Sequence, residues 1–340
     1  MSFNITLADE DVNFQCEASQ TILEAALQQG VTLSYGCKNG LCGSCIGSLI
    51  SGQIEYPDGQ PEGINEDEVS NHQALFCKAT PLSDLSIKVK VIKEEIQEVK
   101  NLPAKVKEIK HLSEDVIQMV LQLPSVESFD FKAGQWIYFV LKDGRKRAFS
   151  IANSPNDKNE LELQIRHAFG GVFTDFVFNK LKPGALLKIE GPHGTFFNQQ
   201  DECPILLVAG GTGFAPIKGI LEEIVKQDAK QPIHLFWGLR SKKDLYLQQL
   251  INTWVKDYGI SYTPVLSEPE KEDVWEGSTG FVHQAVLEQF SQLSNFAVYM
   301  AGPPQMIDAC KQSFVNAGLD KSKLYYDSFD YSTDAIDAMN

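Results

Sequence analysis

Four cysteines constrain this chain more than any other feature of its sequence. Cys37, Cys42 and Cys45 follow one another with four and then two residues between them, and Cys77 lies far downstream at the end of Ala-Leu-Phe-Cys. Thiolates bind iron–sulfur clusters, and this spacing suits a pair of irons, each held by two of the four sulfurs. The first three ligands lie in a loop rich in Gly and Ser, residues small enough for a tight turn. The pattern therefore predicts a [2Fe–2S] cluster bound by Cys37, Cys42, Cys45 and Cys77.

A structural zinc site is the alternative, but such sites usually pair two short C-x2-C clips, and only one is present. Around the cysteines, residues 1–92 predict a strand hairpin at 3–16, a helix at 21–29, strands at 47–54 and 85–91, and an acidic loop at 57–70. This order resembles the β-grasp fold of plant-type ferredoxins.

Length and charge narrow the remaining possibilities. A chain of 340 residues predicts two or three domains. We expect no membrane span and no signal peptide, because no apolar run is long enough and the start lacks a basic region followed by an apolar block. The net charge of −15 argues against nucleic acid as a partner. We therefore expect a cytoplasmic monomer in which Cys16, Cys203 and Cys310 are free buried thiols.

Residues 93–102 are charged and read as a linker, and residues 103–200 then predict an antiparallel β-barrel of six short strands. Two motifs lie in it. In the first, Arg147 offers a cation for a diphosphate, Phe149 an aromatic face and Ser150 a hydroxyl. In the second, Gly170-Gly171 opens a helix whose N-terminal N–H groups suit a phosphate. Each motif alone is common in ordinary strands and helices, but together they indicate a flavin site.

Residues 201–330 alternate strands and helices, as in a doubly wound parallel α/β domain. The run 204–209 is apolar throughout, which is typical of a strand buried on both faces. The loops 210–213 and 301–304 follow predicted strands, and ligands bind at the carboxyl ends of such strands. Residues 331–340 are expected to be a disordered or docking tail.

Taken in order, these motifs resemble the ferredoxin–NADP reductase superfamily, and the fused N-terminal ferredoxin segment narrows the likeness to oxygenase reductase components. The group named CDP-6-deoxy-Δ3,4-glucoseen reductase is more similar still. The resemblance implies that FAD is held by Arg147, Phe149, Ser150, Gly171 and Thr174. It implies that the nicotinamide nucleotide is held by Gly210, Gly211, Thr212, Gly213, Gly302 and Pro303.

The resemblance also places Phe329 over the flavin, with Asp327 a weaker candidate whose plainer interpretation is an exposed surface acid. Ala301 stands where the family often has Cys, which puts the fine positioning of the nicotinamide in question. The residues named as catalytic, Ser150 near flavin N5 and Phe329 over the ring, are positioning groups, since the flavin supplies the chemistry.

The implied activity is that of an NAD(P)H-dependent iron–sulfur flavoprotein reductase. Electrons would pass from NAD(P)H through FAD and the cluster to a partner protein. A deoxysugar dehydratase, an oxygenase component and free flavin are the alternative acceptors. Arg240 can accept the 2′-phosphate of NADPH, yet the resemblance favours NADH, with NADPH tolerated.

The acid is concentrated in the N-terminal segment. Residues 1–92 hold twelve Asp and Glu against four Lys and no Arg. The acids of loop 57–70 predict a docking surface for a basic patch on the acceptor, with a merely solvated loop as the alternative. Those acids are Asp58, Glu62, Glu66, Asp67 and Glu68.

Overall fold

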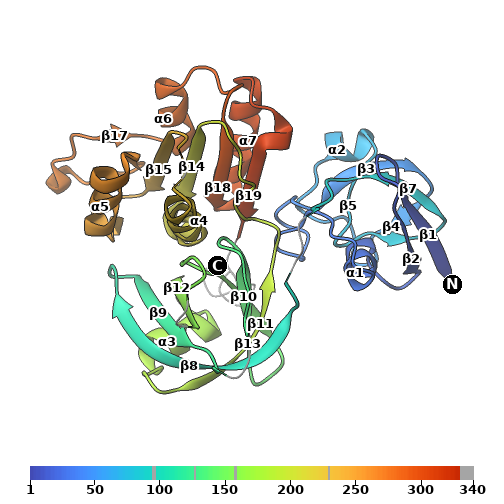
Figure 1. The fold of residues 1–340 in the computed structure, drawn as a ribbon, viewed down its shortest axis with the longest axis horizontal. Helices are drawn as coiled ribbons and strands as arrows, with labels where there is room; N and C mark the ends of the chain where they lie inside the picture. Colours follow the sequence, from blue (N-terminus) through green and yellow to red (C-terminus); the bar gives the residue numbers. More distant parts are fainter. Residues whose placement is uncertain (94–96, 126–127, 157–158, 229, 330–340) are drawn as a thin grey trace. The chain divides into compact units, whose positions relative to one another are not determined.

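The structure is a computed structural model that describes residues 1–93, 97–125, 128–156, 159–228 and 230–329 (Figure 1). It divides into two compact units, the first formed by Met1–Ile96 with Asp327–Phe329 and the second by Gln97–Tyr326. The expected tail at 331–340 and part of the expected linker, 94–96, lie outside the described residues. Within the described ranges, no helix is both long enough and apolar enough to cross a bilayer.

The first unit is built on a five-stranded mixed sheet in the order β2-β1-β7-β3-β5. β1 pairs antiparallel with β2 and parallel with β7, as expected for a β-grasp fold. Ile22, Ala25 and Ala26 of helix α1 are buried in the core of this unit. The elements are β1 (Ser2–Leu7), β2 (Asn13–Glu17), α1 (Ile22–Gln28), β3 (Ile46–Ser51), β4 (Ile54–Glu55), α2 (Glu66–Ser70), β5 (Gln73–Leu75), β6 (Thr80–Pro81) and β7 (Leu85–Lys88).

The acidic segment expected to be a loop contains the short helix α2. Asn65 begins it with a capping box, in which its side chain accepts from the Glu68 N–H while the Glu68 side chain accepts from the Asn65 N–H. The segment is anchored by the buried Ile64 and by a bond from the Gly63 N–H to the Gly40 carbonyl, 2.8 Å long. The acidic segment is therefore fastened directly to the cysteine loop.

The second unit begins with the predicted antiparallel barrel, in the strand order β11-β10-β13-β8-β9-β12. A bridge between Ile151 and Leu163 joins the two end strands and closes it. The first strand starts at Lys100, inside the expected linker, and the sixth of the expected strands, for which no bounds were assigned from the sequence, is β13 at residues 186–193. The elements are β8 (Lys100–His111), β9 (Val116–Gln122), β10 (Trp136–Val140), β11 (Lys146–Ser150), β12 (Glu160–Arg166), α3 (Val172–Asn179) and β13 (Leu186–His193).

The second unit continues into a six-stranded sheet in the order β17-β16-β15-β14-β18-β19. The β14–β15, β14–β18 and β15–β16 pairings are parallel, as predicted. The strands are β14 (Ile205–Gly210), β15 (Ile233–Leu239), β16 (Ser261–Leu266), β17 (Ser278–Thr279), β18 (Ala297–Gly302) and β19 (Leu324–Ser328). The helices are α4 (Phe214–Lys226), α5 (Gln248–Tyr258), α6 (Val282–Gln289) and α7 (Pro304–Asn316).

Both faces of this sheet are covered, which explains why β14 is apolar along its whole length. Helices α6 and α7 share a core cluster with Leu206 and Val208 on one face. On the other face, Trp237 of β15 stacks on Phe214 of α4 with 4.2 Å between ring centroids. The carboxyl ends of the strands are left for ligands.

Candidate cluster, flavin and nucleotide sites

The four predicted cluster ligands lie together and fall into two pairs. The Cys37 N–H donates to the Cys42 sulfur at 3.3 Å, and the Cys42 N–H donates to the Cys37 sulfur at 3.4 Å. Cys45 and Cys77 share a side-chain hydrogen bond of their own. Among the described residues, no group of three or more His, Cys, Asp or Glu side chains is arranged to hold one metal ion. Two pairs suit the two irons of a [2Fe–2S] cluster better than one zinc.

Each pair contains one thiol that ionises more readily than the other. The hydrogen bond from the Cys42 thiol lowers the pKa of Cys37 to about 7, despite its burial. The hydrogen bond with Cys45 lowers the pKa of Cys77, and the same bond together with burial raises the pKa of Cys45. Iron binds the thiolate, so a hydrogen bond that lowers the pKa of one thiol in each pair favours the form that binds the metal.

Glycines leave room for the ligand loop. A Cβ at Gly36 would lie 3.1 Å from the Cys42 sulfur and 3.2 Å from the Ser44 hydroxyl. Gly40 has a φ of +85°, and its Cβ would meet the Lys78 side chain at 2.9 Å. Larger residues at these positions would displace a ligand or its neighbour, which explains the small residues noted in the sequence.

The predicted flavin residues of the barrel come together at β11 and the start of α3. The Phe149 ring lies 5.5 Å from the Phe173 ring, which joins the two motifs at one end of the barrel core. The Arg147 guanidinium donates to the Lys146 carbonyl at 3.0 Å, and Ser150 is half-buried. Gly171 is the N-cap of α3, so the N–H groups of the first turn have no intrahelical acceptor. This arrangement fits a ring on β11 and a diphosphate at the helix start.

The Thr174 hydroxyl is bonded to the backbone of the loop before α3, and its predicted contact with the diphosphate stays a prediction. Its hydroxyl donates to the Ala168 carbonyl at 2.8 Å and accepts from the Ala168 N–H at 3.2 Å. The side chain therefore fastens the loop before α3. A hydroxyl followed by a short helix carries no local signal that separates these two roles.

The two glycine loops of the α/β domain also meet. A Cβ at Gly213 would lie 2.0 Å from the Ala301 carbonyl oxygen, and a Cβ at Gly302 would lie 3.1 Å from the Gly210 Cα. The Trp237 indole N–H donates to the Gly211 carbonyl at 2.9 Å and holds the first loop in place. Only glycine allows the two loop backbones to approach so closely. The loops that contain Gly210–Gly213 and Gly302 therefore lie against each other at the carboxyl ends of β14 and β18, and we call this surface the glycine floor. Pro303 follows as the N-cap of α7.

Sequence reasoning missed Glu268 at the same edge. The Glu268 N–H donates to the Arg240 carbonyl at 2.8 Å, so this exposed acid lies beside the exposed Arg240 at the ends of β16 and β15. The neighbouring lysines are occupied: Lys242 donates to the Asp273 carbonyl at 2.8 Å, and Lys243 lies 2.8 Å from Glu270. The sequence did carry a signal for Glu268, because an acidic residue just after a predicted parallel strand lies at the edge where nucleotides bind.

The last described residues correct one expectation and leave another open. Asp327 is 5% exposed, so its interpretation as an exposed surface acid is wrong. Phe329 is half-buried and belongs to the first compact unit, and its place over a flavin stays a prediction. The three cysteines outside the cluster are free thiols, as expected, but only Cys16 and Cys310 are buried, and Cys203 is half-buried.

A buried lysine joins the barrel to the α/β domain. Lys218 of α4 donates to the Ala152 carbonyl at 2.9 Å, to Glu162 of β12 at 3.1 Å and to Glu222 at 2.7 Å. Nearby, the buried Tyr246 hydroxyl donates to Gln164 at 2.9 Å. These bonds hold the strand next to the flavin residues against the helix that follows the first glycine loop.

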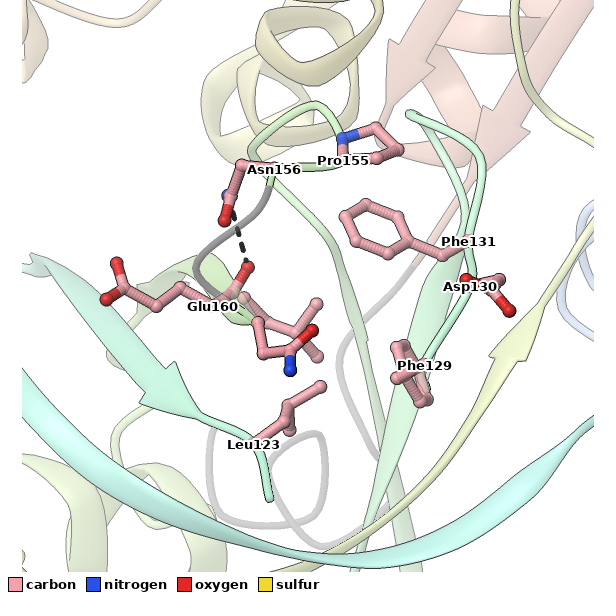
Figure 2. Close-up of a pocket in the computed structure, with 9 residues that line it drawn as sticks. Leu123, Phe129, Asp130, Phe131, Pro155, Asn156 and Glu160 are labelled. Atoms are coloured by element: carbon pink, nitrogen blue, oxygen red, sulfur yellow. Dashed lines mark hydrogen bonds between the residues drawn. The ribbon is translucent and has the colours of Figure 1, made fainter. Parts of the chain in front are cut away.

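A small pocket of about 140 Å³ opens elsewhere on the barrel. Figure 2 shows Phe129 and Phe131 on one side of it and Asn156 and Glu160 on the other. Cofactor pockets usually measure about 300–1,000 Å³. No residue predicted to bind a cofactor lines this pocket, so we assign no cofactor to it.

Comparison with known proteins identifies the architecture. Residues 5–82 match the 2Fe-2S iron-sulfur cluster binding domain, residues 103–197 the oxidoreductase FAD-binding domain, and residues 207–312 the oxidoreductase NAD-binding domain. The chain is 38% identical to the CDP-6-deoxy-L-threo-D-glycero-4-hexulose-3-dehydrase reductase of Yersinia pestis, over 97% of this chain and 99% of that protein.

This chain belongs to the ferredoxin–NADP reductase superfamily. It is also 34% identical to the phenol hydroxylase P5 protein of Acinetobacter pittii, over 97% of this chain and 95% of that one. The crystal structure of the Amycolatopsis reductase GcoB superposes with a TM-score of 0.76 at 29% identity, covering 96% of this chain and 98% of that one. The reductase therefore binds a [2Fe–2S] cluster, FAD and NAD(P)H, and it passes electrons from NAD(P)H to a partner protein.

Proposed function

We propose that the electron acceptor of this reductase is a dehydrase that acts on a nucleotide-linked 6-deoxyhexulose. The observation that carries the proposal is the 38% identity to a reductase named for such a dehydrase, which extends over nearly all of both chains. It includes the cluster domain, which is the part that must deliver electrons to the acceptor.

The chain's own residues position the cofactors. When bound, FAD accepts the two electrons of a hydride and the cluster transfers electrons singly, so the pair connects a two-electron donor to a one-electron acceptor. Arg147 and the first turn of α3 would neutralise the flavin diphosphate, and Ser150 would place a hydroxyl near the ring. The glycine floor would hold the nicotinamide nucleotide close to that ring, and Lys218 fixes the spacing between the two domains.

The test is electron delivery to purified acceptors. The full-length protein is mixed with NADH and either the dehydrase of the Yersinia system with its CDP-sugar substrate or the oxygenase component of a phenol hydroxylase. NADH consumption that requires both the dehydrase and its sugar supports the proposal. NADH consumption that requires the oxygenase component and does not depend on the dehydrase overturns the proposal. That result would favour the second candidate, an oxygenase component as the acceptor, which the 34% identity to a phenol hydroxylase protein supports. Faster turnover with free riboflavin than with either protein would favour a flavin reductase.

We infer further that this reductase prefers NADH. Glu268 follows β16 at the edge where the nucleotide would bind, and its carboxylate would accept hydrogen bonds from ribose hydroxyls and repel the 2′-phosphate of NADPH. Arg240 is the nearby cation that would favour NADPH, but Lys242 and Lys243 are occupied with the 270–273 segment and cannot readily assist it.

The substitution Glu268→Ala tests this inference. Because a hydrogen bond to a charged group contributes about 1.5–3 kcal/mol, we expect kcat/KM for NADH to fall about ten- to hundredfold and the NADH-to-NADPH ratio to fall with it. The matched control Glu276→Ala, another exposed acid of this domain, should leave the ratio unchanged. An unchanged ratio in Glu268→Ala, or a wild-type preference for NADPH that is lost in Arg240→Ala, contradicts the inference.

A further inference from the structure

Asp327 is a buried acid near the end of the described chain. It is only 5% exposed, and aspartate is rarely buried to this degree in a folded protein. The segment Asp327–Phe329 belongs to the same compact unit as the cysteine loop, although the two are far apart in the sequence. The reason for an acid at this position therefore lies in what surrounds it in the cluster domain.

The Asp327 carboxylate lies beside the loop that holds the first three cluster ligands. A Cβ at Gly36 would lie 3.5 Å from the Asp327 Oδ1 atom, 3.1 Å from the Cys42 sulfur and 3.2 Å from the Ser44 hydroxyl. The carboxylate oxygen and the ligand sulfur are thus neighbours of the same point beside Gly36. Cys42 is 6% exposed, so both groups are surrounded by protein and not by water.

Burial decides how strongly a charge at this place acts on the cluster. At a separation of about 7 Å or less, two charges interact about four times more strongly in a protein, where the effective dielectric constant is about 20, than in water. The exposed acids of the same unit are screened by water and salt. Asp9, for example, has a side chain that is 60% exposed and lies 2.8 Å from Lys88.

We propose that Asp327 sets the driving force of electron delivery, because its carboxylate lowers the reduction potential of the [2Fe–2S] cluster. Net charge close to a cluster is one of the properties that determine its potential. The reduced cluster carries one more negative charge than the oxidised cluster, so a neighbouring carboxylate opposes the gain of that electron. The reduced cluster is then a stronger one-electron donor to the acceptor.

Asp327 makes and breaks no bond and transfers no proton in this role. The proposal rests on the cluster domain alone. It is independent of which acceptor protein or nicotinamide nucleotide the reductase uses, so its failure would leave the proposed acceptor untouched.

The test is a redox titration of the cluster in the full-length holoprotein, followed by the electron paramagnetic resonance signal of the reduced cluster. Asp327→Asn keeps the shape of the side chain and removes its charge. At a fixed applied potential, the ratio of reduced to oxidised cluster should rise about tenfold, which is a shift of about 59 mV to higher potential for a one-electron couple. Asp327→Glu keeps the charge and should change the ratio less than about threefold.

The matched control is Asp9→Asn, which removes an exposed charge from the same unit and should change the ratio less than about twofold. An unchanged potential in Asp327→Asn would overturn the proposal. A lower potential would also overturn it, because Asp327 would then act as a neutral acid that donates a hydrogen bond. Equal shifts in Asp327→Asn and Asp327→Glu, or loss of the cluster in Asp327→Asn, would show that the residue only supports the packing of the loop.

Discussion

Replacing Lys218 by Met tests the connection between the barrel and the α/β domain. The Lys218 side chain is 4% exposed, and its ammonium group has three oxygen partners, one of them on β12 of the barrel. Met keeps much of the volume but removes the charge and all three bonds. Two carboxylates, Glu162 and Glu222, are then left without their buried cation.

The magnitude follows from the burial of those carboxylates. Removing one partner of a buried ion pair costs about 3–5 kcal/mol. The Glu162 and Glu222 side chains are 15% and 24% exposed and keep some contact with water, so we expect the lower end, about 3 kcal/mol. For a unit of this size, 1 kcal/mol shifts the unfolding midpoint by about 2–4 °C, which predicts a fall of about 6–12 °C.

The assay is thermal unfolding of the full-length protein, followed by the flavin fluorescence that appears when the second unit opens. The matched control is Lys243→Met, which removes an exposed pair with Glu270 and should cost less than about 1 kcal/mol. Adding Glu162→Gln to Lys218→Met should recover part of the loss, because it removes one uncompensated charge. A midpoint in Lys218→Met within about 1 °C of the wild type would refute the reasoning.

Two further predictions concern the first unit. Cys42→Ser should abolish the visible absorption of the cluster and electron delivery to the acceptor, while NADH-driven reduction of ferricyanide persists because that dye takes electrons from the flavin; loss of both activities would contradict a modular chain. Neutralising the α2 acids Glu66, Asp67 and Glu68 together should slow delivery to the acceptor and weaken its salt dependence, since charges are screened over about 10 Å at 0.1 M salt. Ferricyanide turnover serves as the control, and delivery that responds to neither salt nor the triple change would make α2 an ordinary solvated helix.

Much of the site could be predicted because its signals are local. The ligand loop around Cys42 is a short stretch whose spacing is set by the cluster, and it needs no distant partner to be recognised. The apolar run of β14 and the glycines after it likewise report a buried parallel strand and a close backbone approach. Motifs of this kind can be recognised in the sequence without knowledge of the tertiary structure.

Side-chain roles that depend on a distant partner could not be predicted. The Thr174 hydroxyl bonds to the backbone of Ala168, and nothing in Gly-Gly-x-x-Thr distinguishes that role from phosphate binding. The strand β13 has a weak local pattern and becomes a strand because β8 and β10 pair with it on either side. Tertiary context decided both cases.

The sequence by itself therefore determined the three cofactor-binding domains and the cysteines that bind iron, since these depend on spacing and periodicity along the chain. Only the tertiary structure decided that Glu268 lies beside Arg240, that Asp327 is buried and that Lys218 joins α4 to the barrel. Each of these facts depends on contacts between residues of different elements. Those contacts arise when the sheets and helices pack together. Packing is the sum of many weak interactions, and no single stretch of the sequence contains them.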